Sequence, residues 1–171
     1  MSNAVTPAHE AATSTVTAPL AAAPLTIDQL RGLGGHHLGH SDWHLVTQEQ
    51  VNAFGAVTED EQWIHVDTDR AAHGPFGTTI AHGYLTLGMM TKLLTQVLVV
   101  DPSATIINYG LGKVRFPAPV LVGARIRADV TCREVTEVRG GVQVLLDVTI
   151  QAEGTDRPSC VAEVLFRYYA A

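Results

Sequence analysis

The chain has 171 residues, of which 46% are hydrophobic and 16% charged, and its formal net charge is -6. This length suits one domain, and the apolar content excludes a wholly disordered chain. The acidic balance and the lack of a Lys/Arg cluster argue against a nucleic-acid-binding protein. No apolar run has the length of a membrane-spanning helix.

The N-terminal segment differs in composition from the rest of the chain. Residues 1–23 are rich in Ala, Thr, Ser and Pro, which predicts a disordered tail. They lack the basic start and apolar block of a signal peptide. Cys132 and Cys160 fall in strand-like segments outside any CxxC pair, so we expect two small buried thiols. These features favour a cytoplasmic protein.

Short elements are expected at the beginning of the domain. Thr26–Leu33 (TIDQLRGL) predicts a short helical turn. The next segment, GLGGHHLGHSD at 32–42, is rich in glycine, which predicts irregular chain. Trp43–Val46 then predicts a short strand.

A capping box marks the first longer helix. Thr47 suits an N-cap and Gln50 follows three residues later, so a helix is predicted over Gln48–Ala56. The stretch Val57–Thr78 is predicted to be irregular, and loops of this length inside a domain tend to carry function. Ile80–Val100 is apolar almost all the way round, which predicts a buried helix.

The second half has the alternation of apolar and polar residues that is typical of β-strands. Gly140-Gly141 indicates a hairpin turn between two of the strands. A buried helix followed by meandering strands predicts an α+β domain, in which a curved antiparallel β-sheet wraps around a long central α-helix. A lone sheet leaves edges and part of the helix uncovered, so we expect a homodimer at least. The predicted strands are Thr105–Phe116, Arg125–Glu137, Val142–Glu153 and Ser159–Tyr168.

Residues that can carry chemistry gather between the two predicted helices. Asp60 and His65 lie five residues apart in the irregular stretch, and His82-Gly83 stands near the start of the buried helix. A carboxylate and an imidazole suit proton transfer. A free backbone N–H in a first helical turn suits a developing oxyanion, and glycine lets a ligand approach the backbone. Each signal alone is common, so it is their order and spacing that predict a site.

These segments resemble the MaoC-like hydratases, also called R-specific enoyl-CoA hydratases, which have the hot-dog fold. The family signature is an Asp, four residues, a His, and then a stretch ending in Phe-Gly-x-x-Ile-Ala-His-Gly. It stands here as Asp60–His65 and Phe76–Gly83. The segment NYGLGKVRFPAPV at 108–120 is also similar to the family's strand after the central helix. The resemblance spans about residues 36–169 and implies a single hot-dog domain over residues 24–171.

The resemblance implies a hydro-lyase that reversibly adds water in syn fashion to a trans-2-enoyl-CoA, giving an (R)-3-hydroxyacyl-CoA. Carried over, Asp60 and His65 bind and activate the water, and the backbone amide of Gly83 polarises the thioester carbonyl. No cofactor is implied, because coenzyme A is part of the substrate. Glu59 and Gln62-Trp63 depart from residues common in the family, but the spacing between acid and histidine is intact.

Other functions use the same fold. A 3-hydroxyacyl-carrier-protein dehydratase of fatty-acid elongation would use the same residues with another thioester carrier. A hot-dog thioesterase would need an acid on the central helix, and Gly83–Thr91 contains no Asp or Glu. A non-catalytic acyl-thioester-binding protein would be expected to lose Asp60 or His65, and both are present. The sequence sets neither the acyl chain length nor the direction of flux.

Further residues are candidates for contact with the substrate. Thr91 and Leu94 lie two to three turns beyond Gly83, where the resemblance places the lining of the acyl pocket. Ordinary core packing is the alternative for both. Lys113 and Arg115 are candidates for contact with the phosphates of coenzyme A.

Histidines elsewhere in the chain are weaker candidates. His36, His40 and His44 recur every four residues, which would align three metal ligands on a helix. The surrounding glycines argue against a helix, so no metal site is expected. His82 is expected to have a structural role near the start of the central helix.

Overall fold

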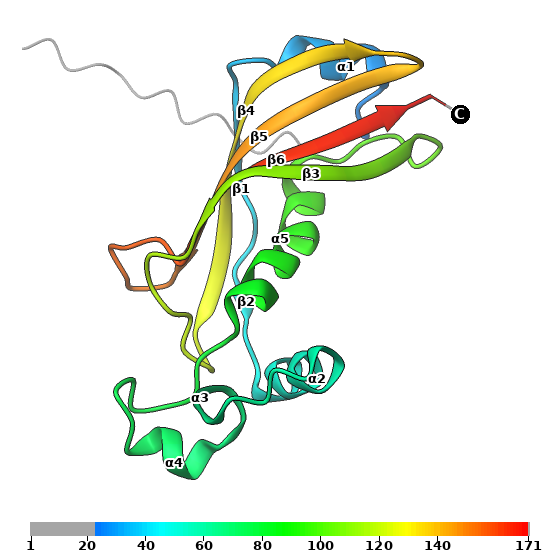
Figure 1. Cartoon of the computed structure of the whole chain (residues 1–171). Coiled ribbons are helices and arrows are strands. Elements are labelled where there is room, and N and C mark those ends of the chain that lie inside the picture. Colours follow the sequence, from blue (N-terminus) through cyan, green and yellow to red (C-terminus); the bar gives the residue numbers. More distant parts are fainter. Residues whose placement is uncertain (1–22, 171) are drawn as a thin grey trace, which may run out of the picture.

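A computed structural model describes residues 23–170, which form one antiparallel sheet with a long helix against its inner face (Figure 1). The predicted α+β class, with a curved antiparallel sheet around a central helix, is confirmed. The predicted disordered tail, residues 1–23, lies outside the described residues except for Ala23. No helix in the described part of the chain has the length and apolar character needed to cross a membrane.

The sheet is ordered β1-β4-β5-β6-β3, and β2 pairs with β4 beside β1. All of these pairs are antiparallel. The four strands predicted in the second half are confirmed to within about one residue at each end. Among residues 23–170, strand β3 hydrogen-bonds to β6 alone, so it is an open edge of the sheet. The strands are β1 (His37–His40), β2 (His44–Leu45), β3 (Thr105–Arg115), β4 (Arg125–Val138), β5 (Gly141–Ala152) and β6 (Cys160–Tyr169).

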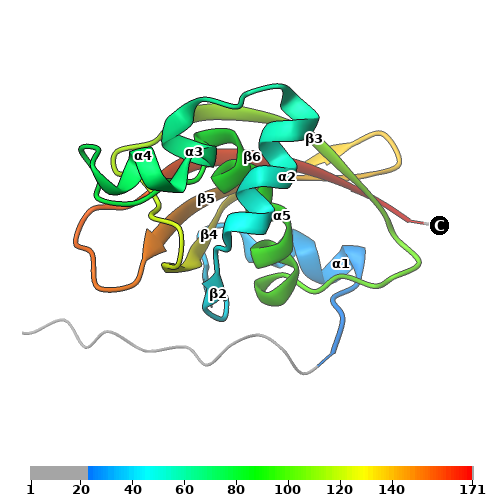
Figure 2. The same ribbon diagram turned by 90° about the horizontal axis from the view of Figure 1, so that it is seen from below.

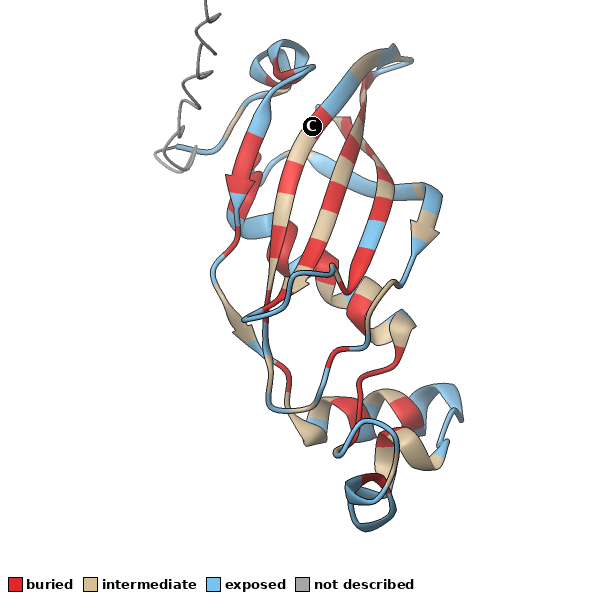
Figure 3. Cartoon of the chain, turned by 90° about the vertical axis from the view of Figure 1, so that its left-hand side faces the viewer, coloured by how far each residue is buried: buried red, intermediate tan, exposed pale blue. Residues whose placement is uncertain are grey.

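Alternate residues of β4, β5 and β6 fill the core, and the bands of buried residues are visible along these strands in Figure 3. Cys132 and Cys160 are both buried, as predicted. Their burial raises the pKa of each thiol to about 11, so neither is a ready nucleophile at neutral pH. The inward side chains are Ile126, Ala128, Val130, Cys132, Val142, Val144, Leu146, Val148, Ile150, Cys160, Ala162, Val164 and Phe166.

The central helix α5 spans Gly83–Val97, which is shorter than the predicted Ile80–Val100. Ile80 lies before the helix in an isolated bridge with Leu121, and His82 is the N-cap with extended backbone. The prediction that this helix is buried all round is wrong for the described chain. Leu93 and Leu94 face the core, whereas Tyr84 is 74% exposed.

Strand β1 corrects the prediction that glycine keeps residues 32–42 irregular. Backbone pairing with β4 orders His37–His40, because a strand that pairs with a neighbour in the sheet satisfies its polar groups despite a poor local propensity. Gly39 has φ of +111° at a bulge in this pair, a conformation that favours glycine.

Helix α2 (Gln48–Thr58) opens with the predicted capping box of Thr47 and Gln50. The following stretch is less irregular than predicted, because it contains the short helices α3 (Trp63–Val66) and α4 (Thr68–Ala72). These three helices gather around the N-terminal end of α5 (Figures 1 and 2). The end of the central helix is therefore enclosed by the segment that carries the predicted catalytic residues.

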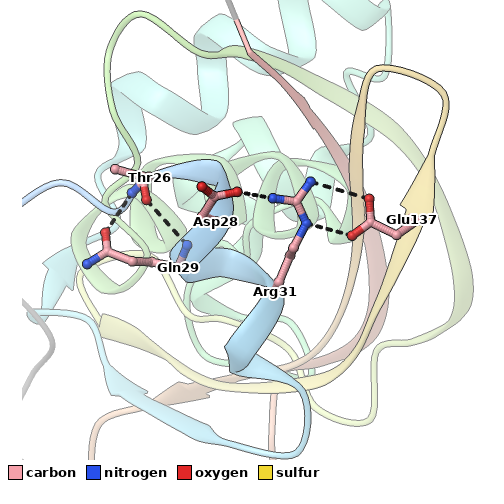
Figure 4. Close-up of polar contacts among 5 residues, drawn as sticks. All are labelled: Thr26, Asp28, Gln29, Arg31 and Glu137. Atoms are coloured by element: carbon pink, nitrogen blue, oxygen red, sulfur yellow. Dashed lines mark hydrogen bonds and ion pairs between the residues drawn. The ribbon is translucent and has the colours of Figure 1, made fainter.

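The predicted turn at Thr26–Leu33 consists of α1 (Ile27–Leu30) followed by one turn of 3-10 helix (Arg31–Leu33). Thr26 and Gln29 form a capping box at its start (Figure 4). Arg31 pairs with Asp28 in its own turn and with Glu137 near the end of β4. These contacts attach the first turn of the domain to the tip of the β4–β5 hairpin.

Candidate active site

Asp60 follows directly after α2, where Glu59 ends the helix with a left-handed backbone (φ 59°). The turn sends the chain back toward the start of α5. Gly55 on α2 permits this approach, because a Cβ atom there would lie 3.1 Å from the carbonyl oxygen of Asp60. Asp60 is exposed.

His65 is the buried member of the predicted pair, with 7% of its surface exposed. Its Nδ1 donates to the carbonyl oxygen of Ile80 at 2.7 Å, so in the neutral ring Nε2 carries the free lone pair. Two further bonds hold its helix in place. The Gln48 side chain donates to the carbonyl of His65 at 2.8 Å, and the backbone N–H of Ile80 donates to Ile64 at 3.0 Å.

His82 joins the two predicted catalytic residues. Its Nε2 donates to the carbonyl oxygen of Asp60 at 2.8 Å. Its ring stacks on His65, with centroids 3.8 Å apart and planes inclined by 26°. Side-chain ligand atoms of Asp60, His65 and His82 all lie within 4.8 Å of one another. The structure thus brings the acid and the histidine together, and His82 contacts both of them.

Gly83 is the first residue of α5, so its backbone N–H has no acceptor within the helix. It and His65 line one cavity of about 230 Å³. Phe116, after the end of β3, closes over the glycine, where a Cβ atom would lie 3.3 Å from the Phe116 ring. An imidazole and a helix N-terminus therefore open onto the same small chamber.

The cavity also contains residues that sequence reasoning missed. Phe116 and Ser159 line it from segments far away in the sequence. Ser159 is 2% exposed, and its hydroxyl has no hydrogen-bond partner among the described residues. No local signal marks these positions, because only the pairing of the strands brings them beside α5.

Thr91 and Leu94 line two further cavities between α5 and the sheet, of about 230 and 300 Å³. Asn108 on β3 and Phe166 on β6 line both of them. About 12 Å of helix separates Gly83 from Thr91 at 1.5 Å per residue. The two predicted pocket residues therefore lie on open space along the helix that begins at the candidate site.

Lys113 and Arg115 are exposed near the end of β3. The guanidinium of Arg115 donates to the carbonyl of Val114 at 2.7 Å. No carboxylate among the described residues forms an ion pair with either side chain. Lys113 nevertheless lies near Glu163 and helps to lower the pKa of that carboxyl. Contact of either cation with the phosphates of coenzyme A stays a prediction.

The comparisons with known proteins agree with this geometry. Residues 32–153 match the model of the family described as MaoC like domain. The chain is 49% identical over 146 residues to the 3-hydroxyacyl-thioester dehydratase Z of Mycobacterium tuberculosis, covering 85% of this chain and 97% of that protein. It is 33% identical over 86 residues to the (R)-specific enoyl-CoA hydratase of Rhodospirillum rubrum, covering 50% of this chain and 57% of that protein.

A solved structure of similar fold is an R-hydratase from Pseudomonas aeruginosa, with a TM-score of 0.68 at 20% identity, covering 85% of this chain and 86% of that chain. The chain belongs to the MaoC-like dehydratase family. The predicted family, the hot-dog fold and the hydro-lyase class are confirmed. The individual roles of Asp60, His65 and Gly83 stay predictions.

Proposed function

We propose that the protein is a reversible 3-hydroxyacyl-thioester dehydratase, which interconverts an (R)-3-hydroxyacyl thioester and a trans-2-enoyl thioester. One observation carries the proposal. His65, whose Nε2 is left free, and Gly83, the first residue of α5, line one cavity. The Asp60 carboxylate lies within 4.8 Å of a His65 ring nitrogen. A proton-transfer pair and an oxyanion donor are the groups that this reaction needs.

The atoms of this reaction balance without a further reactant. In dehydration the α C–H and β C–O bonds break, a C=C bond forms, and the α-proton leaves with the hydroxyl as water. Asp60 and His65 hold this water, which in the reverse direction attacks the β-carbon. Gly83 donates to the thioester oxygen while enolate charge develops there, and the N-terminal end of the α5 dipole favours that charge.

The sequence motif alone favours hydration of a 2-enoyl-CoA. The relative that aligns over nearly its whole length is named a 3-hydroxyacyl-thioester dehydratase, which favours dehydration. Hydration is the same reaction run backward. The acyl chain is proposed to extend from Gly83 toward the cavities at Thr91 and Leu94.

The test is to supply the purified protein with crotonyl-CoA, with (R)- and (S)-3-hydroxybutyryl-CoA, and with the same acyl groups on a carrier protein. We expect crotonyl and (R)-3-hydroxybutyryl thioesters to interconvert and the (S) isomer to be inert. A higher kcat/KM on one carrier identifies the physiological thioester. Absence of turnover on both carriers would favour the non-catalytic acyl-thioester binder and refute the proposal.

We also propose that a second copy of the chain covers the edge at β3. Every residue of β3 is exposed or half-buried, and apolar side chains make up much of that surface. An unpaired, apolar edge strand is prone to pair with another chain. Tyr84 on α5 adds to the uncovered apolar surface. The exposed apolar residues of β3 are Ile106, Ile107, Tyr109 and Leu111.

The expected oligomer is a dimer, measured by light scattering coupled to size exclusion. Replacing both Ile107 and Leu111 by Lys places a charge on each face of the edge strand and is expected to give monomers. Val161→Lys is the matched control, since Val161 is similarly exposed but lies on β6, inside the sheet. A monomeric parent protein, or a dimer that survives both Lys substitutions, would contradict this interface.

A further inference from the structure

A second cluster of histidine and aspartate side chains lies on the outer face of the sheet, where β1 pairs with β4. His37 Nε2 is 3.0 Å and His40 Nε2 is 2.7 Å from the same Asp129 oxygen, Oδ2. The two imidazole rings meet edge to face, with centroids 5.5 Å apart. All three side chains are close to half exposed, so solvent reaches the cluster.

The bulge in β1 creates this arrangement. Residues three apart on a regular strand point to opposite faces. Here the register slips between His37 and Gly39, so His37 and His40 point to the same face. His40 stands directly opposite Asp129 on β4, and His37 stands opposite Thr131, two residues along. Three metal-ligand side chains thus converge on one point of a rigid pair of strands.

The charges around Asp129 distinguish it from the other carboxylates along this face. Arg125 pairs with Glu153, and Arg133 pairs with Asp147 and with Glu163. No Lys or Arg among residues 23–170 forms an ion pair with Asp129; its partners there are the two imidazoles. Arg127, the next outward residue along β4, lies over the Trp43 ring instead.

We propose that His37, His40 and Asp129 form a binding site for a divalent transition-metal ion of the zinc class. Two imidazoles and one carboxylate are ligands that such ions take, with solvent free to complete the coordination shell. Bonds of about 2.0–2.2 Å to a tetrahedral ion hold ligand atoms about 3.3 Å apart. The N–O distances of 3.0 and 2.7 Å observed here need to open by about 0.3 and 0.6 Å to reach this spacing.

This site is separate from the candidate active site and does not depend on the proposed function. It also differs from the set of metal ligands that the sequence spacing suggests, in which His36, His40 and His44 would share a helix. Only His40 belongs to both sets. His36 bonds backbone carbonyls of its own turn, and His44 contacts Gln50 and Lys92.

The test is calorimetric titration of the full chain with Zn²⁺, in an Asp60→Asn/His65→Gln background that removes two of the three ligands of the active-site cluster. We expect one equivalent to bind per chain. His37→Gln, His40→Gln and Asp129→Asn should each weaken this binding by at least about tenfold. His73→Gln is the matched control, because this exposed histidine bonds only within its own helical turn.

Two outcomes would overturn the site. One is an affinity for Zn²⁺ that is unchanged in all three ligand variants, which would show scattered surface binding. The other is the absence of a saturable equivalent in the background protein. Melting curves give a second measurement, since the same concentration of Zn²⁺ should raise Tm less after Asp129→Asn than in the background protein. Asp129→Asn alone should leave crotonyl-CoA turnover unchanged, because the cluster is not part of the active site.

Discussion

Replacing Asp60 by Asn or His65 by Gln is expected to lower kcat for crotonyl-CoA hydration by about 10²–10⁴-fold, the usual contribution of a positioned acid or base. Asp60→Asn keeps the shape of the side chain and removes its basicity. His65→Gln can keep a donor toward the Ile80 carbonyl while it removes the free imidazole nitrogen. Steady-state kinetics on both variants measure the effect.

The controls for this prediction separate chemistry from folding. His73→Gln changes an exposed histidine in the same region of the chain and should keep full activity. Circular dichroism should show parent-like spectra for all variants. The double variant should be little worse than either single one, because the two residues act on the same water. Full activity in either single variant would show that its residue has no catalytic role.

Local patterns were sufficient for the parts of the site that lie close together in the sequence. The spacing of Asp60 and His65 predicts that they lie close together, because only one turn and a short helix connect them. The capping box at Thr47 likewise depends only on residues within one turn. The start of α5 was misplaced by three residues, since the bridge between Ile80 and Leu121 is a contact across the fold that local hydrophobicity does not reveal.

Local sequence patterns do not predict features that depend on pairing between strands far apart in the chain. Strand β1 forms in a glycine-rich segment because β4 supplies its hydrogen bonds, which override local propensity. The same pairing brings Asp129 to His37 and His40. Likewise Phe116, which follows β3, lies over Gly83 at the start of α5, although the two residues are far apart in the sequence. The exposed side of α5 was also missed, since an apolar helix gives the same pattern whether its own chain or another covers it.

His82 gives the second large expected effect, through the position of Asp60 and His65 rather than through proton transfer. It donates to the Asp60 carbonyl and stacks on His65. His82→Phe keeps an aromatic ring for stacking but removes the donor. Loss of one partner from a hydrogen bond like this costs about 1–3 kcal/mol. If the loss of this bond raises the activation free energy by the same amount, because Asp60 moves out of position, kcat falls by roughly 10–100-fold with little change in KM.

The His82 variants distinguish a positioning residue from a second base. His82→Gln restores an N–H donor and should recover part of the kcat that His82→Phe loses. The pH profile of kcat/KM should keep its shape in both variants, because His65 retains its free nitrogen. A profile that loses its acidic limb, where protonation of a base stops the reaction, would instead make His82 a base in the reaction. Parent-like kcat in His82→Phe would show that the bond to Asp60 and the chemistry are independent, and that the turn after α2 holds the carboxylate in place without it.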